Sequence, residues 1–164
     1  MAQTTTYFGL ISGSPKLEYN TTGGSTFTAA EGELVSVTLP DNTREVGDVH
    51  TLDGDLPLIA PGKISAGQMT VRGVFTGASS GFWQDAQTAY QTGSALYFRF
   101  YPAGSAAGRY RFSSGNNAVG SAGSATNGAC YVQQRPVPAV DADTAAVFTY
   151  EVPIMCPGFT GGSL

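Results

Sequence analysis

The sequence is short of charge, histidine and cysteine. Only 12% of its 164 residues are charged, and the formal net charge is −4. Its eight Lys and Arg residues are scattered, so no basic stripe is available to bind nucleic acid or an anionic membrane surface. The single histidine, His50, and the two cysteines, Cys130 and Cys156, leave little material for catalysis or for a zinc site.

The sequence also lacks a long apolar run and a basic, apolar signal segment at its start. The first ten residues are MAQTTTYFGL, and the longest uncharged stretches are rich in Gly and Ser. We therefore expect a protein that is made and assembled in a cytoplasm, without a membrane partner. Cys130 and Cys156 lie in strand-like segments, where buried, reduced thiols are the simpler interpretation and a disulfide stays open.

What the sequence does contain is alternation of apolar and polar residues. This period-two pattern runs through residues 69–75, 96–101 and 148–154 and predicts β-strands, the first of which is expected to span residues 64–75. The abundance of Gly, at 22 residues, with much Thr and Ser, favours strands and turns over helices. The predicted fold class is α+β, a mostly antiparallel β-sandwich or barrel of six to seven strands with one helix packed on it.

The one helix is predicted over residues 80–93. Its apolar residues recur at helical spacing, and we expect three of them, Phe82, Trp83 and Tyr90, to anchor it on the sheet, with Trp83 as the main anchor. Ser79 or Ser80 is expected to cap its start and Gly93 to close its end.

The chain reads as a single domain with appended segments. We expect the domain to span residues 16–157, with an N-terminal arm at 1–15 and a C-terminal tail at 158–164. Residues 113–128 are almost entirely Gly, Ser, Ala and Asn, which predicts a flexible insertion.

The most unusual segment is a long connection at residues 43–63, which we expect to be a loop. Neighbouring strands are usually joined by a few residues, yet this connection is long and rich in apolar side chains that its own domain cannot bury. Such a loop is expected to bury itself against another molecule. The residues predicted to make this contact are Arg44, Val46, Asp48, Val49, Leu52, Asp53, Asp55, Leu56, Leu58 and Ile59.

Motifs for chemistry are missing. No serine has a G-x-S-x-G setting, so a catalytic role for His50 has no support. Asp53-Gly54-Asp55 does not have the spacing of a calcium loop and is better explained as a turn. We expect no enzyme activity, no cofactor and no metal.

In order and spacing, the sequence resembles the tail tube proteins of bacteriophages with long, non-contractile tails, or of related gene transfer agents. The resemblance lies in VSVTLP leading into REVGDVHTLDGD, then PGKISAGQMTVRG, a helix at 82–92, ALYFRFYP and a closing VFTYEV. It implies a structural virion protein whose hexameric rings stack into a tube, with the long loop contacting a neighbouring ring.

The resemblance also implies partners. These are further copies of the chain, a tape-measure protein, a tail terminator, a distal tail protein, and genomic DNA that passes non-specifically through the lumen. Alternatives are the inner tube, terminator or another accessory protein of a phage-derived particle. A soluble carbohydrate-binding module, suggested only by the aromatic content, is a further alternative from a different class.

Overall fold

The computed structural model describes residues 15–30, 34–49, 58–77, 79–102, 110–114, 128–139 and 148–163. These residues form eleven strands and one helix, in the order β1 (Lys16–Asn20), β2 (Thr28–Ala29), β3 (Leu34–Thr38), β4 (Arg44–Val49), β5 (Leu58–Ile64), β6 (Gly67–Val74), α1 (Phe82–Thr92), β7 (Tyr97–Tyr101), β8 (Tyr110–Ser114), β9 (Tyr131–Val132), β10 (Thr149–Cys156) and β11 (Phe159–Ser163). The α+β class with one helix is confirmed, although the strands outnumber the predicted six to seven.

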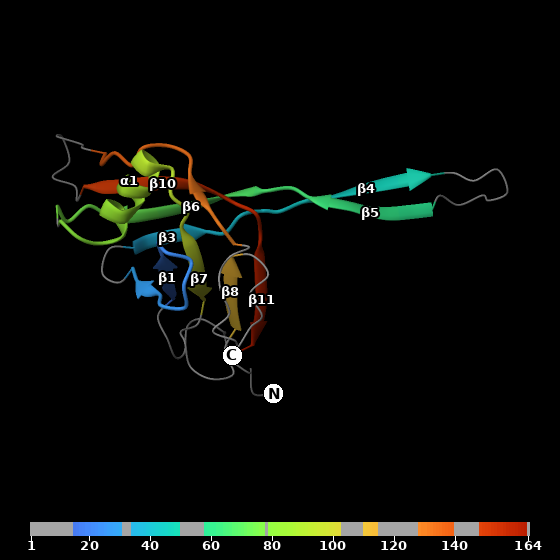
Figure 1. The fold of residues 1–164 in the computed structure, drawn as a ribbon, viewed down its shortest axis with the longest axis horizontal. Coiled ribbons are helices and arrows are strands. Elements are labelled where there is room, and N and C mark those ends of the chain that lie inside the picture. Colours follow the sequence, from blue (N-terminus) through green and yellow to red (C-terminus); the bar gives the residue numbers. More distant parts are fainter. Residues whose placement is uncertain are drawn as a thin grey trace, which may run out of the picture.

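The strands form two larger sheets and one separate ribbon. One sheet has five strands in the order β11-β8-β7-β1-β2, and the other has four in the order β3-β6-β10-β9. Among the described residues, strands β4 and β5 pair only with each other. All of these pairings are antiparallel. The strands of the two sheets run in clearly different directions, and the ribbon projects away from the body that they form (Figure 1).

Strict alternation along β6 and β10 builds the centre of the body. Met69 and Val71 on β6 are fully buried, as are Val152 and Ile154 on β10, while the residues between them are exposed or half-buried. The two strands pair along their whole length, from Thr149 opposite Val74 to Cys156 opposite Gly67. The core cluster continues into the other sheet and the helix through Leu17, Tyr19, Phe82, Ala86, Ala89, Leu96 and Phe98.

Helix α1 is anchored mainly by Phe82, which is 1% exposed. Its ring packs edge-on against Tyr19 and Phe98, with centroids 5.2 and 6.1 Å away. Trp83 is half-buried against Phe75. Tyr90 is 42% exposed, although it follows buried Ala86 by four residues, so the prediction that it anchors the helix was wrong.

The helix ends are set mainly by the backbone. Gly81 is the N-terminal cap residue and no side chain bonds there, so the predicted caps Ser79 and Ser80 do not act. At the other end Gly93 has φ 67°, and its amide donates to the carbonyl of Ala89. This left-handed conformation favours glycine, and the predicted closure at Gly93 is confirmed.

Two predicted boundaries need correction. Most of the expected tail at 158–164 is strand β11, which pairs with β8 and forms one edge of the five-stranded sheet. Ser113 and Ser114 belong to β8 and are buried, so the predicted insertion at 113–128 does not begin at Ser113. Residues 1–14 and 115–127 lie outside the described residues.

We expect Phe82→Ala to lower the free energy of unfolding by about 3–5 kcal/mol, because it removes a fully buried ring. Tyr90→Ala on the same helix is the matched control, and it should cost less than about 1 kcal/mol. Urea unfolding followed by tryptophan fluorescence measures both. Equal losses for the two variants would contradict the assignment of Phe82 as the anchor.

Candidate assembly surface

The candidate functional surface is the ribbon formed by β4 and β5. Val49 lies opposite Leu58, Asp48 opposite Ile59 and Val46 opposite Pro61. Beyond Val46 the register shifts, so that Arg44 lies opposite Ile64. The ribbon connects β3 to β6 and extends well beyond the ends of both sheets (Figure 1).

The base of the ribbon is fastened by hydrogen bonds around Ser65. The Ser65 amide donates to the carbonyl of Thr43 at 2.9 Å, and the Asn42 side chain donates to the carbonyl of Ser65 at 2.8 Å. Arg44 Nη1 donates to the carbonyl of Gly62 at 3.1 Å. These bonds fix how the ribbon leaves the body, while its strands are paired only with each other.

Every described side chain of β4 is exposed, and so are those described on β5. The large apolar ones are 62% exposed at Val46, 64% at Val49, 70% at Ile59 and 51% at Ile64. Because side chains alternate between the two faces of a ribbon, the register places Val46 and Ile59 on the same face. An isolated two-stranded ribbon is only marginally stable in water, so these apolar side chains form a surface suited to contact with another molecule.

The local structure predicted for the contact segment was wrong, and its role in contacts stays a prediction. Residues 43–63 were expected to be a loop, whereas six of the ten predicted contact residues lie on paired strands: Arg44, Val46, Asp48, Val49, Leu58 and Ile59. The other four, Leu52, Asp53, Asp55 and Leu56, lie outside the described residues, as does His50. Pro61 is tolerated because it stands next to the register shift, where ladder bonding is already interrupted.

Ile64 is a surface residue that the sequence-based prediction missed. We expected it to begin the next long strand, over residues 64–75. Instead it ends β5, and Ser65 and Ala66 separate it from β6. The sequence does carry a local signal for this break, because Ile64 is out of phase with the buried alternation of Met69, Val71 and Gly73 and would lie on the opposite face of a continuous strand.

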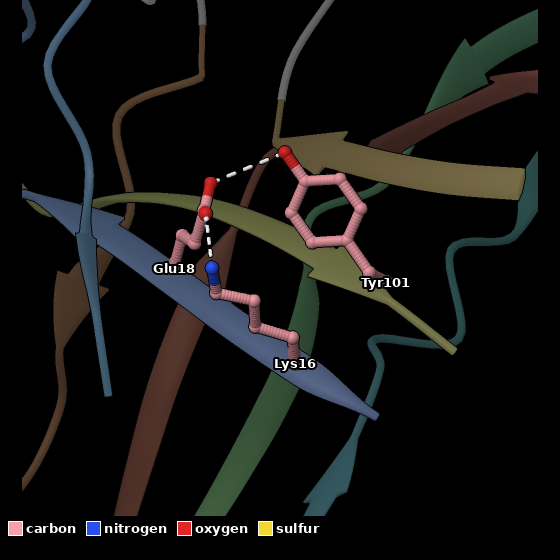
Figure 2. Close-up of polar contacts among 3 residues, drawn as sticks. All are labelled: Lys16, Glu18 and Tyr101. Atoms are coloured by element: carbon pink, nitrogen blue, oxygen red, sulfur yellow. Dashed lines mark hydrogen bonds and ion pairs between the residues drawn. The ribbon is translucent and has the colours of Figure 1, made fainter. Parts of the chain in front are cut away.

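A second feature is the polar face of the five-stranded sheet. Glu18 on β1 receives two contacts, one to each carboxylate oxygen (Figure 2). Lys16 Nζ lies 3.1 Å from Oε1, and the Tyr101 hydroxyl donates to Oε2 at 3.1 Å. The Lys16 contact lies within β1, whereas the Tyr101 contact joins β7 to β1, which the register allows because Tyr101 lies directly opposite Lys16, two residues from Glu18.

Two arginines lie beside this group. Arg99 stacks over the ring of Phe27, with its guanidinium carbon 3.7 Å from the centroid. Burial, together with the neighbouring Arg111 guanidinium, lowers the pKa of Arg99, while Tyr101 and Glu18 act in the opposite direction. Arg111 is only 6% exposed. Among the described residues, this face fixes the positions of charged side chains such as Glu18 and Arg99, but it places no nucleophile beside a base.

Within the described part of the chain, no group of three or more His, Cys, Asp or Glu residues is placed to hold a metal ion. No helix among the same residues is long and apolar enough to cross a membrane. The site that the described residues do provide is therefore the apolar ribbon.

The fold is similar to those of several tube assemblies. It matches a chain in the tail of an empty gene transfer agent particle with C6 symmetry, with TM-score 0.57 and 14% identity over 91% of this chain and 94% of that one. It also matches a chain of an extracellular contractile injection system, the PVC sheath–tube complex in its extended state, with TM-score 0.58 and 13% identity over 98% and 95%. The SPP1 tail tube matches with TM-score 0.52 and 12% identity over 92% and 77%.

The chain has the phage-type tail tube fold. The similarity lies in the structure alone: no protein-family model matches the sequence, and no curated protein is significantly similar to it. The fold expected from the order and spacing of the motifs is thereby confirmed.

If the ribbon takes no part in the core of its own subunit, its apolar side chains are dispensable for folding. We expect Val46→Ser combined with Ile59→Ser to change the free energy of unfolding of the monomer by less than about 1 kcal/mol. Ile154→Ala, in the buried face of β10, is the contrasting variant and should cost about 2–5 kcal/mol. Urea unfolding at low protein concentration tests both, and a large loss in the ribbon variant would mean that the ribbon packs on its own body.

Proposed function

We propose that the chain is the structural subunit of a tail tube, in which six copies form a ring and the rings stack. The observation that carries this proposal is an extended ribbon with exposed Val46, Val49, Ile59 and Ile64 on a tail tube fold. The C6 symmetry of the similar gene transfer agent tail supports the number of subunits. Accordingly the protein belongs in the virion and carries no catalytic site.

The ribbon supplies the contact between rings. Burying a large aliphatic side chain stabilises a contact by about 1.5–3 kcal/mol. Val46, Val49, Ile59 and Ile64 are each at least half exposed in the monomer, so a partner can still bury them. The net free energy of contact per ribbon is modest, because association and the ordering of side chains both cost free energy. Six ribbons act together in a ring, so a weak contact per subunit becomes a strong contact between rings.

The lumen of such a tube serves as a conduit for genomic DNA. The chain has a net charge of −4 and no basic cluster, and a surface without excess positive charge lets phosphate groups pass without binding. The proposed partners at the two ends and in the lumen are a tail terminator, a distal tail protein and a tape-measure protein.

A second candidate is the inner tube of a contractile injection system. It is favoured by the match to the PVC sheath–tube complex, which covers 98% of this chain. Electron microscopy of particles that contain the protein separates the two candidates. A bare tube supports the non-contractile tail, whereas a tube inside a second, contractile protein layer supports the inner tube.

The test of the stacking role places charge on the ribbon. We expect wild-type protein to form tubes as its concentration rises, and Val46→Asp combined with Ile59→Asp to stop at single rings or monomers, because a carboxylate in an apolar contact costs its hydration. Negative-stain electron microscopy and sedimentation velocity provide the readout.

Val137→Asp is the matched control. Val137 is 65% exposed, as the ribbon residues are, but it lies outside the ribbon, so this variant should still form tubes. Compact monomers at every concentration of wild-type protein would contradict the proposed function. Tubes from the ribbon variant would remove the stacking role from the ribbon.

A further inference from the structure

The two cysteines face each other across a pair of strands. Ile154 on β10 lies opposite Val132 on β9, and Met155 lies opposite Tyr131. One further step along this antiparallel register places Cys156 opposite Cys130. Both side chains are fully buried, and both cysteines are free in the structure.

The hydrogen bonds identify the kind of position that the two cysteines occupy. The Gln133 amide donates to the carbonyl of Pro153 at 2.9 Å, which makes 133 and 153 a hydrogen-bonded pair. Such pairs alternate with non-hydrogen-bonded ones, so 131 and 155 form the next bonded pair and Cys130 and Cys156 a non-bonded one.

The main chain of Cys130 gives the same result independently. Its amide donates to the carbonyl of Leu96 and its carbonyl accepts from the Leu96 amide, both at 2.8 Å. Both backbone groups therefore point away from β10, as a non-bonded position requires. Facing residues at such positions have Cα atoms about 4.5 Å apart, which falls within the range of about 4.4–6.8 Å found in disulfides.

The thiols are protected in the resting protein. Cys130 Sγ donates to the carbonyl of Gly128 at 3.3 Å, and Cys156 Sγ lies 3.9 Å from the carbonyl of Ile154. The neighbouring Cys130 thiol, together with burial, raises the pKa of Cys156. Because the thiolate is the reactive form, the reduced pair is expected to persist in a reducing cytoplasm and to react only when the strands open transiently.

We propose that Cys130 and Cys156 are a latent disulfide, closed by a low-molecular-weight disulfide such as oxidised glutathione. One thiolate attacks a sulfur of oxidised glutathione, forming a mixed disulfide and releasing one glutathione thiolate. The second cysteine thiolate then attacks the protein sulfur of the mixed disulfide and releases the second glutathione. The two cysteines lose two protons and two electrons in total, and one oxidised glutathione becomes two glutathione molecules.

The bond would reinforce the weakest edge of the four-stranded sheet. Strand β9 has only two residues, Tyr131 and Val132, and stands at the end of the sheet order. A covalent link to β10 ties this edge to the strand at the centre of the core. We expect the midpoint of thermal unfolding to rise by about 5–10 °C when the bond closes.

The experiment uses the full-length protein, reduced and then incubated with oxidised glutathione over a series of urea concentrations below the unfolding transition. Iodoacetamide quenching and intact-mass spectrometry follow. The expected product has lost two hydrogen atoms, takes up no iodoacetamide and yields a linked Cys130–Cys156 peptide. Cys130→Ser and Cys156→Ser are the controls, and each should stop at a single mixed disulfide.

Three results would overturn the proposal, and wild-type protein alone decides each of them. The first is a product that carries one glutathione on each cysteine without closure. The second is a dimer joined by a disulfide between two chains. The third is a urea concentration at which iodoacetamide alkylates both cysteines but oxidised glutathione does not form the disulfide between them. None of these results depends on whether the protein forms tubes.

Discussion

The pairing of β6 with β10 is the interaction on which the rest of the structure depends. Eight residues of β10 face eight of β6 without a break in register, and the buried faces of both strands form the centre of the core. β6 also pairs with β3 on its other side, so the strands before and after the ribbon are held side by side. At Gly67 the approach is so close that an added Cβ would lie 2.8 Å from the Cβ of Pro40. The direction of the ribbon therefore follows from the core.

The parts of the fold that the sequence predicted are those specified by local periodicity. The alternation along 148–154 and the helical spacing at 82–92 each reflect one buried face. A buried face requires an apolar residue at every second position of a strand, or at every third to fourth position of a helix. Strand β11 has the sequence FTGGS, which shows no alternation of apolar and polar residues. It is a strand because β8 offers it hydrogen bonds, and pairing of this kind depends on context more than on propensity.

The ribbon shows a different limit of sequence interpretation. Its apolar content predicted a contact surface, and the structure places several of these side chains, such as Val46 and Ile59, on an exposed ribbon. Its strands were missed because an exposed ribbon has no buried face to impose alternation, and Gly47, Pro61 and Gly62 interrupt the pattern further. The prediction for Tyr90 was wrong for another reason: it has the helical spacing of Ala86 and Trp83, at i+4 and i+7, but spacing alone does not reveal where along the helix the covering sheet ends.

An exposed apolar ribbon also needs protection against uncontrolled pairing with other strands. Its edges carry charges at Arg44, Glu45, Asp48 and Lys63, and Pro61 removes one backbone donor. Charges and proline on edges are the usual means by which proteins avoid edge-to-edge aggregation. The ribbon therefore combines apolar side chains that favour burial with edges that resist strand addition. Under the proposed function, this combination favours a partner surface that covers the faces of the ribbon, and it keeps free subunits apart until a ring presents six such surfaces at once.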